Sequence, residues 1–223
     1  MRVLVVEDEP QLTLRLQQAL EAAGFAVDTA YDGEEGCYLG DTESYDAVVL
    51  DLGLPKLDGI SVLGRWREAG RRMPVLVLTA RSRWAEKSAA FAAGADDYVT
   101  KPFEMEEIVT RIRALIRRAA GHASPEIVCG PLRMDINGGR VTVDGMAVAL
   151  TAQEFRILSY LAHHQGRVVG RSELVEHVYD RNADPESNVL DVLVARIRRK
   201  LKVEVIQTLR GQGWRMEPPA DAG

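Results

Sequence analysis

The 223-residue chain has little of several residue types, and each shortage narrows what the protein can be. Only two cysteines occur, Cys37 and Cys129, which favours reduced thiols in a cytoplasmic protein over a disulfide framework. No apolar run approaches the ~18 residues that a membrane-spanning helix needs. The four apolar residues before Glu7 are too few for the core of a signal peptide. We therefore expect a cytoplasmic protein with no membrane partner.

The chain also lacks an overall excess of positive charge. It holds 28 lysines and arginines against 33 acidic residues, a formal net charge of −5. The imbalance lies in residues 1–120, which hold 15 basic and 20 acidic residues, whereas residues 121–223 hold 13 of each. Within that neutral second half, residues 196–215 hold seven basic residues and one acidic residue. Such a concentration is a candidate polyanion-binding surface, although a charged run by itself is more often a solvated face.

Residues 1–118 alternate short apolar runs with helical patterns. The runs, at 3–6, 26–30, 47–50, 75–78 and 98–99, are mostly continuous, as in strands buried on both faces. Helical patterns follow them at 12–23, 33–40, 61–69, 82–93 and 104–118. Five strand–helix repeats predict an α/β domain with a doubly wound (βα)₅ parallel sheet and helices on both faces.

Residues 119–125 interrupt this pattern. They contain no charged residue, are rich in small residues and end in Pro125, so we expect an interdomain linker. In the segment that follows, Asp144 and Gly145 suit a type I′ hairpin turn, and Thr151 with Glu154 forms a capping box for a helix at 155–163. Further helices are expected at 172–178 and 187–201, before a glycine-turned hairpin. This order predicts an α+β winged helix-turn-helix domain at 126–218.

Polar side chains follow the ends of four predicted strands in the first domain. Glu7 and Asp8 follow the first strand, Asp51 ends the third, Thr79 ends the fourth and Lys101 follows the fifth. Parallel sheets bind ligands at this carboxyl edge. Converging carboxylates repel one another unless a cation relieves them, and Mg²⁺ prefers oxygen ligands. With a lysine and a hydroxyl beside them, the acids support in-line phosphoryl transfer to Asp51.

Each of these residues alone would more often be a surface residue or a helix cap. Asp8, for example, could simply cap a helix that begins at Pro10. The phosphoryl donor must be another molecule, because no Gly-Lys-Ser/Thr phosphate loop is present.

The segments around these residues resemble the receiver signature of response regulators. They are Val-Val-Glu7-Asp8-Glu9, Val-Val-Leu-Asp51-Leu-Gly-Leu-Pro55-Lys-Leu-Asp58-Gly59, Leu-Thr79-Ala80-Arg81 and Gly94-Ala-Asp-Asp-Tyr98-Val-Thr-Lys101-Pro102-Phe103. The resemblance implies a flavodoxin-like receiver with strand order 2-1-3-4-5, spanning residues 1–118. It also implies that a sensor histidine kinase phosphorylates Asp51. Asp8, Asp51 and the Gly53 carbonyl would then hold Mg²⁺, with Glu7 acting through a bound water.

The same resemblance assigns a conformational switch and a dimer interface. Thr79 and Tyr98 would form the switch pair, and the Lys101–Pro102 peptide bond would be cis. Phosphorylation would promote a two-fold dimer through the fourth helix, fifth strand and fifth helix. The family analogy pairs Lys87 with Glu107, Asp97 with Arg111, and Asp96 with Arg118. By themselves, such residues would be ordinary solvated helix charges.

Residues 187–201 and 208–214 resemble the recognition helix and wing of OmpR/PhoB-type regulators, and short motifs are most similar to the PhoP subgroup. Trp214 stands where the family usually has Tyr, a change from which we expect little effect. The resemblance makes Arg196 the best base-contact candidate. The neighbouring DNA-contact candidates are Asn188, Arg198, Arg199, Lys200, Thr208 and Arg210. Residues 179–186 resemble the loop that contacts RNA polymerase. The expected DNA target is a promoter with direct repeats.

Two other functions remain open at this point. An Asp51-nucleophile phosphatase often has a second Asp two residues later, where this chain has Gly53, and it would leave residues 125–216 unexplained. A DNA-binding regulator that is never phosphorylated is disfavoured by the intact acidic set and Lys101. The sequence therefore predicts a phosphorylation-gated transcription factor rather than an enzyme, and reveals neither its kinase nor its operator.

Overall fold

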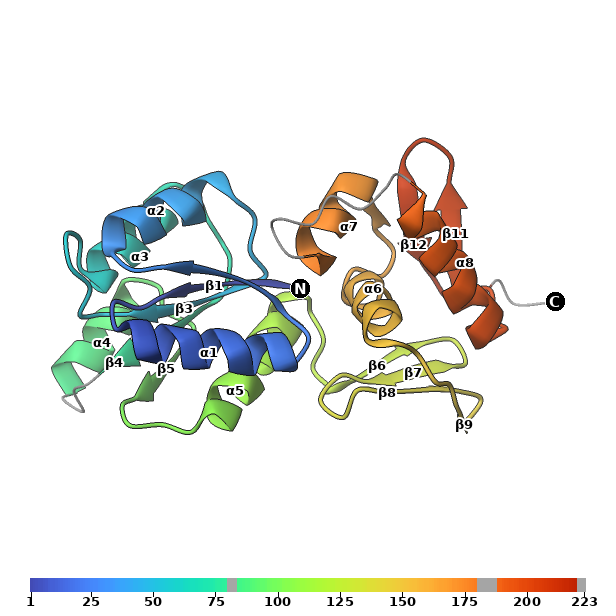
Figure 1. Ribbon diagram of the computed structural model, residues 1–223, viewed down its shortest axis with the longest axis horizontal. Coiled ribbons are helices and arrows are strands. Elements are labelled where there is room, and N and C mark those ends of the chain that lie inside the picture. Colours follow the sequence, from blue (N-terminus) through green and yellow to red (C-terminus); the bar gives the residue numbers. More distant parts are fainter. Residues whose placement is uncertain (80–83, 180–187, 220–223) are drawn as a thin grey trace. The chain divides into compact units, whose positions relative to one another are not determined.

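The computed structural model describes residues 1–79, 84–179 and 188–219, with only the backbone at 84–87. The chain divides into two compact units, Met1–Ala119 and Ala120–Gly223, each of which is described by itself (Figure 1). Among the described residues, no helix is both long and apolar enough to span a membrane.

A five-stranded parallel sheet forms the centre of the first unit. Its strands are β1 (Arg2–Val6), β2 (Ala26–Ala30), β3 (Ala47–Asp51), β4 (Val75–Thr79) and β5 (Asp97–Thr100). Their order is β2-β1-β3-β4-β5, as predicted. Every residue of β1, β3 and β4 is buried, which explains why these strands read as continuous apolar runs.

Helices cover both faces of this sheet. They are α1 (Pro10–Ala22), α2 (Gly33–Thr42), α3 (Gly59–Glu68), α4 (Trp84–Ala92) and α5 (Met105–Ala119). Helices α2 and α3 pack side by side on one face, and α1 and α5 on the other (Figure 1). The predicted (βα)₅ arrangement is confirmed, although residues 82 and 83 of the expected fourth helix lie outside the described part of the chain.

Helix α2 approaches the sheet and α3 closely because glycines face both. A Cβ on Gly36 would lie 2.6 Å from Cγ1 of Val6, and a Cβ on Gly40 would lie 2.4 Å from the indole of Trp66. The fully buried Trp66 also donates its indole N–H to the Cys37 carbonyl at 3.1 Å. Glycine at these two positions therefore sets the spacing between α2 and its neighbours.

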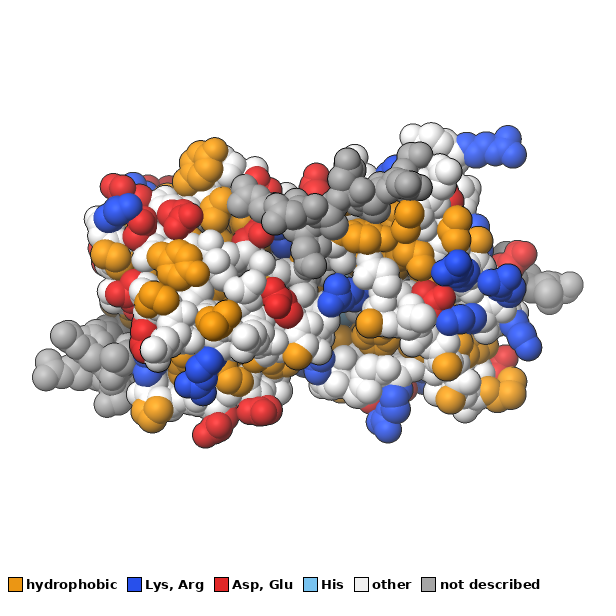
Figure 2. Space-filling view, viewed as in Figure 1, with side chains coloured by type: hydrophobic (Ala, Val, Ile, Leu, Met, Phe, Trp, Pro, Cys, Tyr) orange, Lys and Arg blue, Asp and Glu red, His pale blue; other side chains and the backbone are white. Residues whose placement is uncertain are grey.

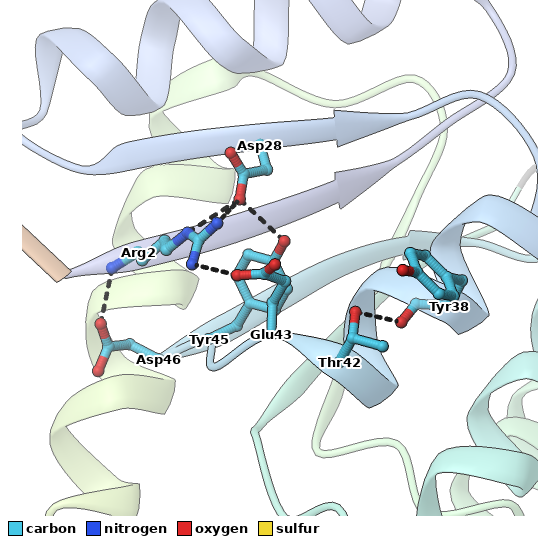
Figure 3. Close-up of polar contacts among 7 residues, drawn as sticks. All are labelled: Arg2, Asp28, Tyr38, Thr42, Glu43, Tyr45 and Asp46. Atoms are coloured by element: carbon cyan, nitrogen blue, oxygen red, sulfur yellow. Dashed lines mark hydrogen bonds and ion pairs between the residues drawn. The ribbon is translucent and has the colours of Figure 1, made fainter. Parts of the chain in front are cut away.

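A buried ionic network ties the start of β1 to β2 and β3 (Figure 3). The Arg2 guanidinium lies 2.6 Å from Asp28 Oδ2 and 3.0 Å from Glu43 Oε2, and 4.9 Å from the centre of the Tyr45 ring. Tyr45 donates its hydroxyl to the same Asp28 oxygen at 2.8 Å, and the Arg2 backbone N–H donates to Asp46 at 2.6 Å. Burial alone would lower the pKa of Arg2, but the neighbouring negative charges raise it.

The second unit begins with an antiparallel sheet in the order β6-β7-β8-β9. Its strands are β6 (Glu126–Cys129), β7 (Leu132–Asp135), β8 (Arg140–Val143) and β9 (Met146–Ala147). Asp144 and Gly145 have φ of +49° and +77°, which confirms the predicted type I′ turn.

Helices and a second antiparallel sheet complete this unit. The helices are α6 (Ala152–His163), α7 (Arg171–Val178) and α8 (Val189–Leu201), and the strands are β10 (Val168–Val169), β11 (Ile206–Leu209) and β12 (Gly213–Met216). The predicted capping box of Thr151 and Glu154 is present at the start of α6. Of this second sheet, the sequence predicted only the hairpin of β11 and β12. Strand β10 joins that hairpin along β12, giving the order β10-β12-β11.

Candidate functional site

Three carboxylates meet at the carboxyl edge of the parallel sheet. Glu7 and Asp8 follow β1 and Asp51 ends β3, and because these strands pair in parallel their ends lie together. One carboxylate oxygen from each of the three residues lies within 4.8 Å of the others. Lys101 places Nζ 2.6 Å from Glu7 Oε2 and 2.7 Å from Asp51 Oδ1. One ammonium group therefore bridges two buried acids.

The environment of these groups sets their charge. Burial and the charge of Asp51 raise the pKa of Glu7, although Lys101 opposes the shift. Burial alone would lower the pKa of Lys101, but hydrogen bonds and charges from Asp51 and Glu7 raise it. Lys101 is thus held protonated beside more carboxylates than it can neutralise. Oxygen donors with an excess of negative charge fit a hard divalent cation such as Mg²⁺.

The helix-cap alternative for Asp8 is wrong. The N-cap residue of α1 is Glu9, not Asp8, and the Glu9 side chain makes no capping hydrogen bond. The backbone carbonyls of Glu7 and Glu9 instead accept hydrogen bonds from the Thr13 hydroxyl at 2.9 and 3.0 Å. The exposed Asp8 therefore lies with the acidic cluster rather than in the cap.

Two further predicted site residues lie on the strands beside this cluster. Thr79 ends β4, is buried, and accepts the Lys101 backbone N–H on its carbonyl at 2.8 Å. Tyr98 is half-buried in β5 and packs edge-on against Phe91 of α4, with ring centres 5.6 Å apart.

The backbone near Asp51 and Lys101 also bears on two predictions. Gly53 donates its backbone N–H to Asp51 Oδ2 at 2.5 Å. The Lys101–Pro102 bond is cis, as the resemblance implied.

The basic surface of the second unit is built on α8. Its buried face consists of Leu190, Val194, Ile197 and Leu201, the stripe that helical spacing predicted. Asn188 precedes the helix as its N-cap residue, so the helix begins later than predicted, and residue 187 lies outside the described chain. The exposed residues on or beside α8 are Asn188, Asp191, Val192, Ala195, Arg196, Arg199 and Lys202. Figure 2 shows basic side chains gathered over α8 and the nearby hairpin.

Some of the predicted contact residues have partners within this unit. Arg198 donates to the Ile206 carbonyl at 3.0 Å and to the Thr208 hydroxyl at 2.8 Å, which joins α8 to β11. Lys200 lies 2.6 Å from Glu154 Oε2, in the capping box of α6. Burial would raise the pKa of Glu154, but the hydrogen bond from Lys200 and others lower it. Arg198 and Lys200 therefore help to hold α8 in place.

One exposed residue on α8 was missed in the sequence. Val192 is apolar yet 46% exposed, and it lies four positions before Arg196, on the same helical face. The available signal was its position outside the stripe of Leu190, Val194, Ile197 and Leu201.

Comparison with known proteins agrees with both halves of this geometry. The family model described as the response regulator receiver domain matches residues 3–113, and the model described as "Transcriptional regulatory protein, C terminal" matches residues 145–216. The two-component response regulator PhoP of Pseudomonas aeruginosa is 43% identical over 218 residues, covering 96% of this chain and 97% of that protein. The chain belongs to the two-component response regulators. Its two matched domains make it a DNA-binding transcriptional regulator of the OmpR/PhoB type.

Further relatives of this response regulator include the transcriptional regulatory protein PhoP of Escherichia coli. That protein is 41% identical over 221 residues, covering 97% of this chain and 99% of its own length. Among solved structures, the receiver domain of the Francisella response regulator 1452 is 35% identical, with a TM-score of 0.52. It covers 53% of this chain and 98% of that chain. The resemblance to the PhoP subgroup is thus confirmed over nearly the whole sequence.

In this response regulator, charges expected to pair between two receivers pair within one. Arg111 lies 2.8 Å from Asp97 Oδ2 and 2.8 Å from Glu107 Oε1. Asp96 accepts a hydrogen bond from Arg67 at 3.1 Å. Arg118 is exposed near the end of α5, and the Lys87 side chain lies outside the described part of the chain. Any pair between two receivers would therefore share or exchange these partners.

Proposed function

We propose that this response regulator is a phosphorylation-gated transcription factor that accepts a phosphoryl group on Asp51 from a sensor histidine kinase in the cytoplasm. The observation that carries the proposal is the Lys101 ammonium, 2.7 Å from Asp51 Oδ1, at an edge where three carboxylates converge. A nucleophilic carboxylate needs both an adjacent positive charge and a way to relieve repulsion from its neighbours.

The residues of the site divide the work of phosphoryl transfer. A carboxylate oxygen of Asp51 attacks phosphorus in line as the phosphorus–nitrogen bond to the kinase imidazole breaks. Lys101 and the Thr79 hydroxyl would stabilise charge on the transferred group. Bound Mg²⁺ would neutralise charge on the phosphoryl oxygens and the carboxylates. The proposed metal-binding residues are Glu7, acting through a water, with Asp8, Asp51 and the Gly53 carbonyl.

The first prediction is that Asp51→Asn abolishes labelling by acetyl phosphate. In the parent chain with Mg²⁺, intact mass spectrometry should detect one added phosphoryl group, and a chelator should prevent it. The matched control is Asp58→Asn, which changes another Asp of the same loop but keeps a good N-cap for α3. Labelling of the Asp51→Asn chain would refute the assignment. Continuous release of phosphate by the parent chain would instead favour a phosphatase. A parent chain that gains no phosphoryl group would favour a regulator that acts independently of phosphorylation.

We further propose that α8 enters the major groove while the wing, residues 206–216, anchors it. Arg196 is exposed on the outer face of α8, and Arg is the commonest reader of guanine in that groove. Val192, on the same face, suits contact with a thymine methyl group. The other proposed contact residues are Asn188, Arg198, Arg199, Lys200, Thr208 and Arg210.

The second prediction concerns two exposed arginines of this surface. Arg196→Ala should weaken binding to the specific site by about 1–3 kcal/mol and relax base preference there, whereas Arg210→Ala should weaken binding and flatten its salt dependence. Arg140→Ala is the matched control, because Arg140 is exposed on β8, away from α8. Fluorescence anisotropy at several salt concentrations provides the measurement. Unchanged affinity in both test variants would contradict the proposed DNA surface.

We also propose a domain plan and a mode of assembly. A linker at 119–125 would join the receiver at 1–118 to the winged-helix domain at 126–218. Phosphorylated receivers would form a two-fold dimer through α4, β5 and α5, placing two DNA-binding domains on direct repeats. Linking two weak binding modules raises avidity by up to ~10²–10⁴ through effective concentration. The loop at 179–186 would contact RNA polymerase, and its residues 180–186 lie outside the described chain.

The third prediction tests that dimer. Arg111→Asp should leave Asp51 phosphorylation intact but keep the phosphoprotein monomeric in sedimentation, because it places acid beside Asp97 and Glu107. Adding Asp97→Arg should partly restore the dimer, since the charges are then opposite again. A phosphorylated Arg111→Asp chain that dimerises as tightly as the parent would rule out this interface.

A further inference from the structure

Arg171 joins three elements of the DNA-binding domain. It is the first residue of α7, and its guanidinium forms an ion pair with Asp191 on α8. The same guanidinium lies over the indole of Trp214 in β12, with Cζ 5.3 Å from the ring centre. Trp214 is only 3% exposed, so it is a fixed platform rather than a mobile surface ring. Helix α7, the recognition helix α8 and the base of the wing therefore meet at one side chain.

The backbone around Arg171 fixes where this side chain starts. Val169 pairs with Trp214 in the β10–β12 ladder, and Arg171 follows only two residues later. At the same point, a Cβ on Gly213 would lie 2.0 Å from the Val169 carbonyl oxygen. Only glycine allows so close an approach of β12 to the segment that leads into α7. The position of Arg171 relative to the wing is thus set by the backbone.

The energies of these contacts indicate a positioning role. The Arg171 and Asp191 side chains are 43% and 55% exposed, and an ion pair so open to solvent contributes little to stability. Stacking of a guanidinium on an indole adds a contribution of similar size and requires a defined geometry. Four apolar residues already bury α8 in the domain core. Arg171 therefore has little influence on whether the domain folds and more on how the wing is oriented.

The two strands of the wing are tied to α8 by different arginines. Arg198 reaches β11 from α8 through the Ile206 carbonyl and the Thr208 hydroxyl. Arg171 reaches β12 through Trp214 and α8 through Asp191. With both contacts present, the hairpin has little freedom to pivot relative to the helix.

We propose that Arg171 is a positioning residue for DNA binding, which sets the orientation of the wing relative to the recognition helix through Trp214 and Asp191. Arg196 on the helix and Arg210 on the wing can then engage one DNA segment together. The inference rests on the DNA-contacting roles proposed above for those two arginines, and it adds Trp214 as part of the mechanism that aligns them.

Amide hydrogen exchange of the full chain tests the structural part without DNA. Arg171→Leu should speed exchange in the wing peptide, residues 206–216, by about threefold or more, and leave α6 unchanged. Arg167→Leu is the matched control, because Arg167 is another partly exposed arginine close to α7, and its ion-pair partner is Glu173 of that helix. Unchanged exchange in the wing of the Arg171→Leu chain would overturn the proposal.

Binding to a duplex that the parent chain selects from random-sequence DNA tests the functional part. Arg171→Leu should weaken DNA binding about tenfold. The affinity of Arg171→Lys should lie between those of the parent and Arg171→Leu, since lysine keeps the charge but not the flat stacking group. In the Arg171→Leu background, Arg210→Ala should reduce DNA affinity much less than it does in the parent chain. Arg196→Ala should reduce DNA affinity by nearly the same factor in both backgrounds. Full additivity with Arg210→Ala would overturn the positioning role. Failure of the parent to select a duplex would count against the proposed DNA surface, while hydrogen exchange would still decide the role of Arg171.

Discussion

Replacing Arg2 with alanine should lower the free energy of unfolding of the receiver by about 3–5 kcal/mol, the usual cost of removing one partner from a buried ion pair. Arg2 and Asp28 are 5% and 9% exposed, so the variant would leave the Asp28 carboxylate in the interior without its positive partner, accepting a hydrogen bond from the neutral Tyr45 hydroxyl. The cost is large because water can reach the abandoned carboxylate only if the sheet edge opens.

Graded variants separate this network from general effects of losing an arginine. Tyr45→Phe removes one hydrogen bond to Asp28 and should cost about 1–2 kcal/mol. Arg140→Ala breaks an ion pair whose arginine is 80% exposed, and should cost no more than ~1 kcal/mol. Urea denaturation followed by circular dichroism, fitted with a separate transition for each domain, provides the comparison. An Arg2→Ala variant no less stable than Arg140→Ala would contradict the buried-network argument.

Two glycine-to-alanine substitutions should have opposite effects in the same receiver. Gly40→Ala should destabilise it by about 1–3 kcal/mol, because the new Cβ would lie 2.4 Å from the indole of Trp66 and would overpack the core. Gly64→Ala, in the interior of α3, meets no atom within 4 Å and should stabilise the receiver by about 0.5–1 kcal/mol through its better helix propensity.

The pair isolates packing from propensity, since both glycines lie within helices. The unfolding midpoint of the receiver transition should fall for Gly40→Ala and rise for Gly64→Ala. A rise of both midpoints would mean that helix propensity outweighs the contact between α2 and α3, and a fall of both would contradict the stabilisation expected for Gly64→Ala. The Trp66 ring has no room to retreat, because it is fully buried and its N–H is bonded to the Cys37 carbonyl.

The central sheet could be predicted because its strands are buried on both faces. Residues 3–6 and 75–78 are continuous apolar runs, and few other local structures produce that pattern. Strand β10 escaped prediction because Val168 and Val169 carry no periodicity and become a strand only by pairing with β12. The boundaries of α8 shifted because Asn188, rather than an earlier residue, caps the helix.

The acidic site could be anticipated from position along the chain, since parallel strands bring their carboxyl ends to one edge. The contacts that the charged side chains make could not be anticipated in this way. Helical spacing places Arg198 and Lys200 on the polar side of α8, yet their partners, Thr208 and Glu154, belong to other elements that only the tertiary fold brings beside α8. Arg111 likewise pairs with Asp97, fourteen positions earlier, which only the packing of α5 on β5 establishes.

The ion pairs of the winged-helix domain bear on its response to salt. Affinity for DNA falls with salt because each phosphate neutralised by a protein cation releases condensed counterions, with a slope of about −0.9 per phosphate. Seven basic residues lie between 196 and 215, but Lys200 and Arg215 are already neutralised by Glu154 and Glu217. Those two cations have no net charge to offer the DNA unless an internal pair breaks. Binding by this segment should therefore depend on ionic strength as if at most about five phosphates were contacted. That slope is shallower than the one expected if all seven basic residues contacted phosphates.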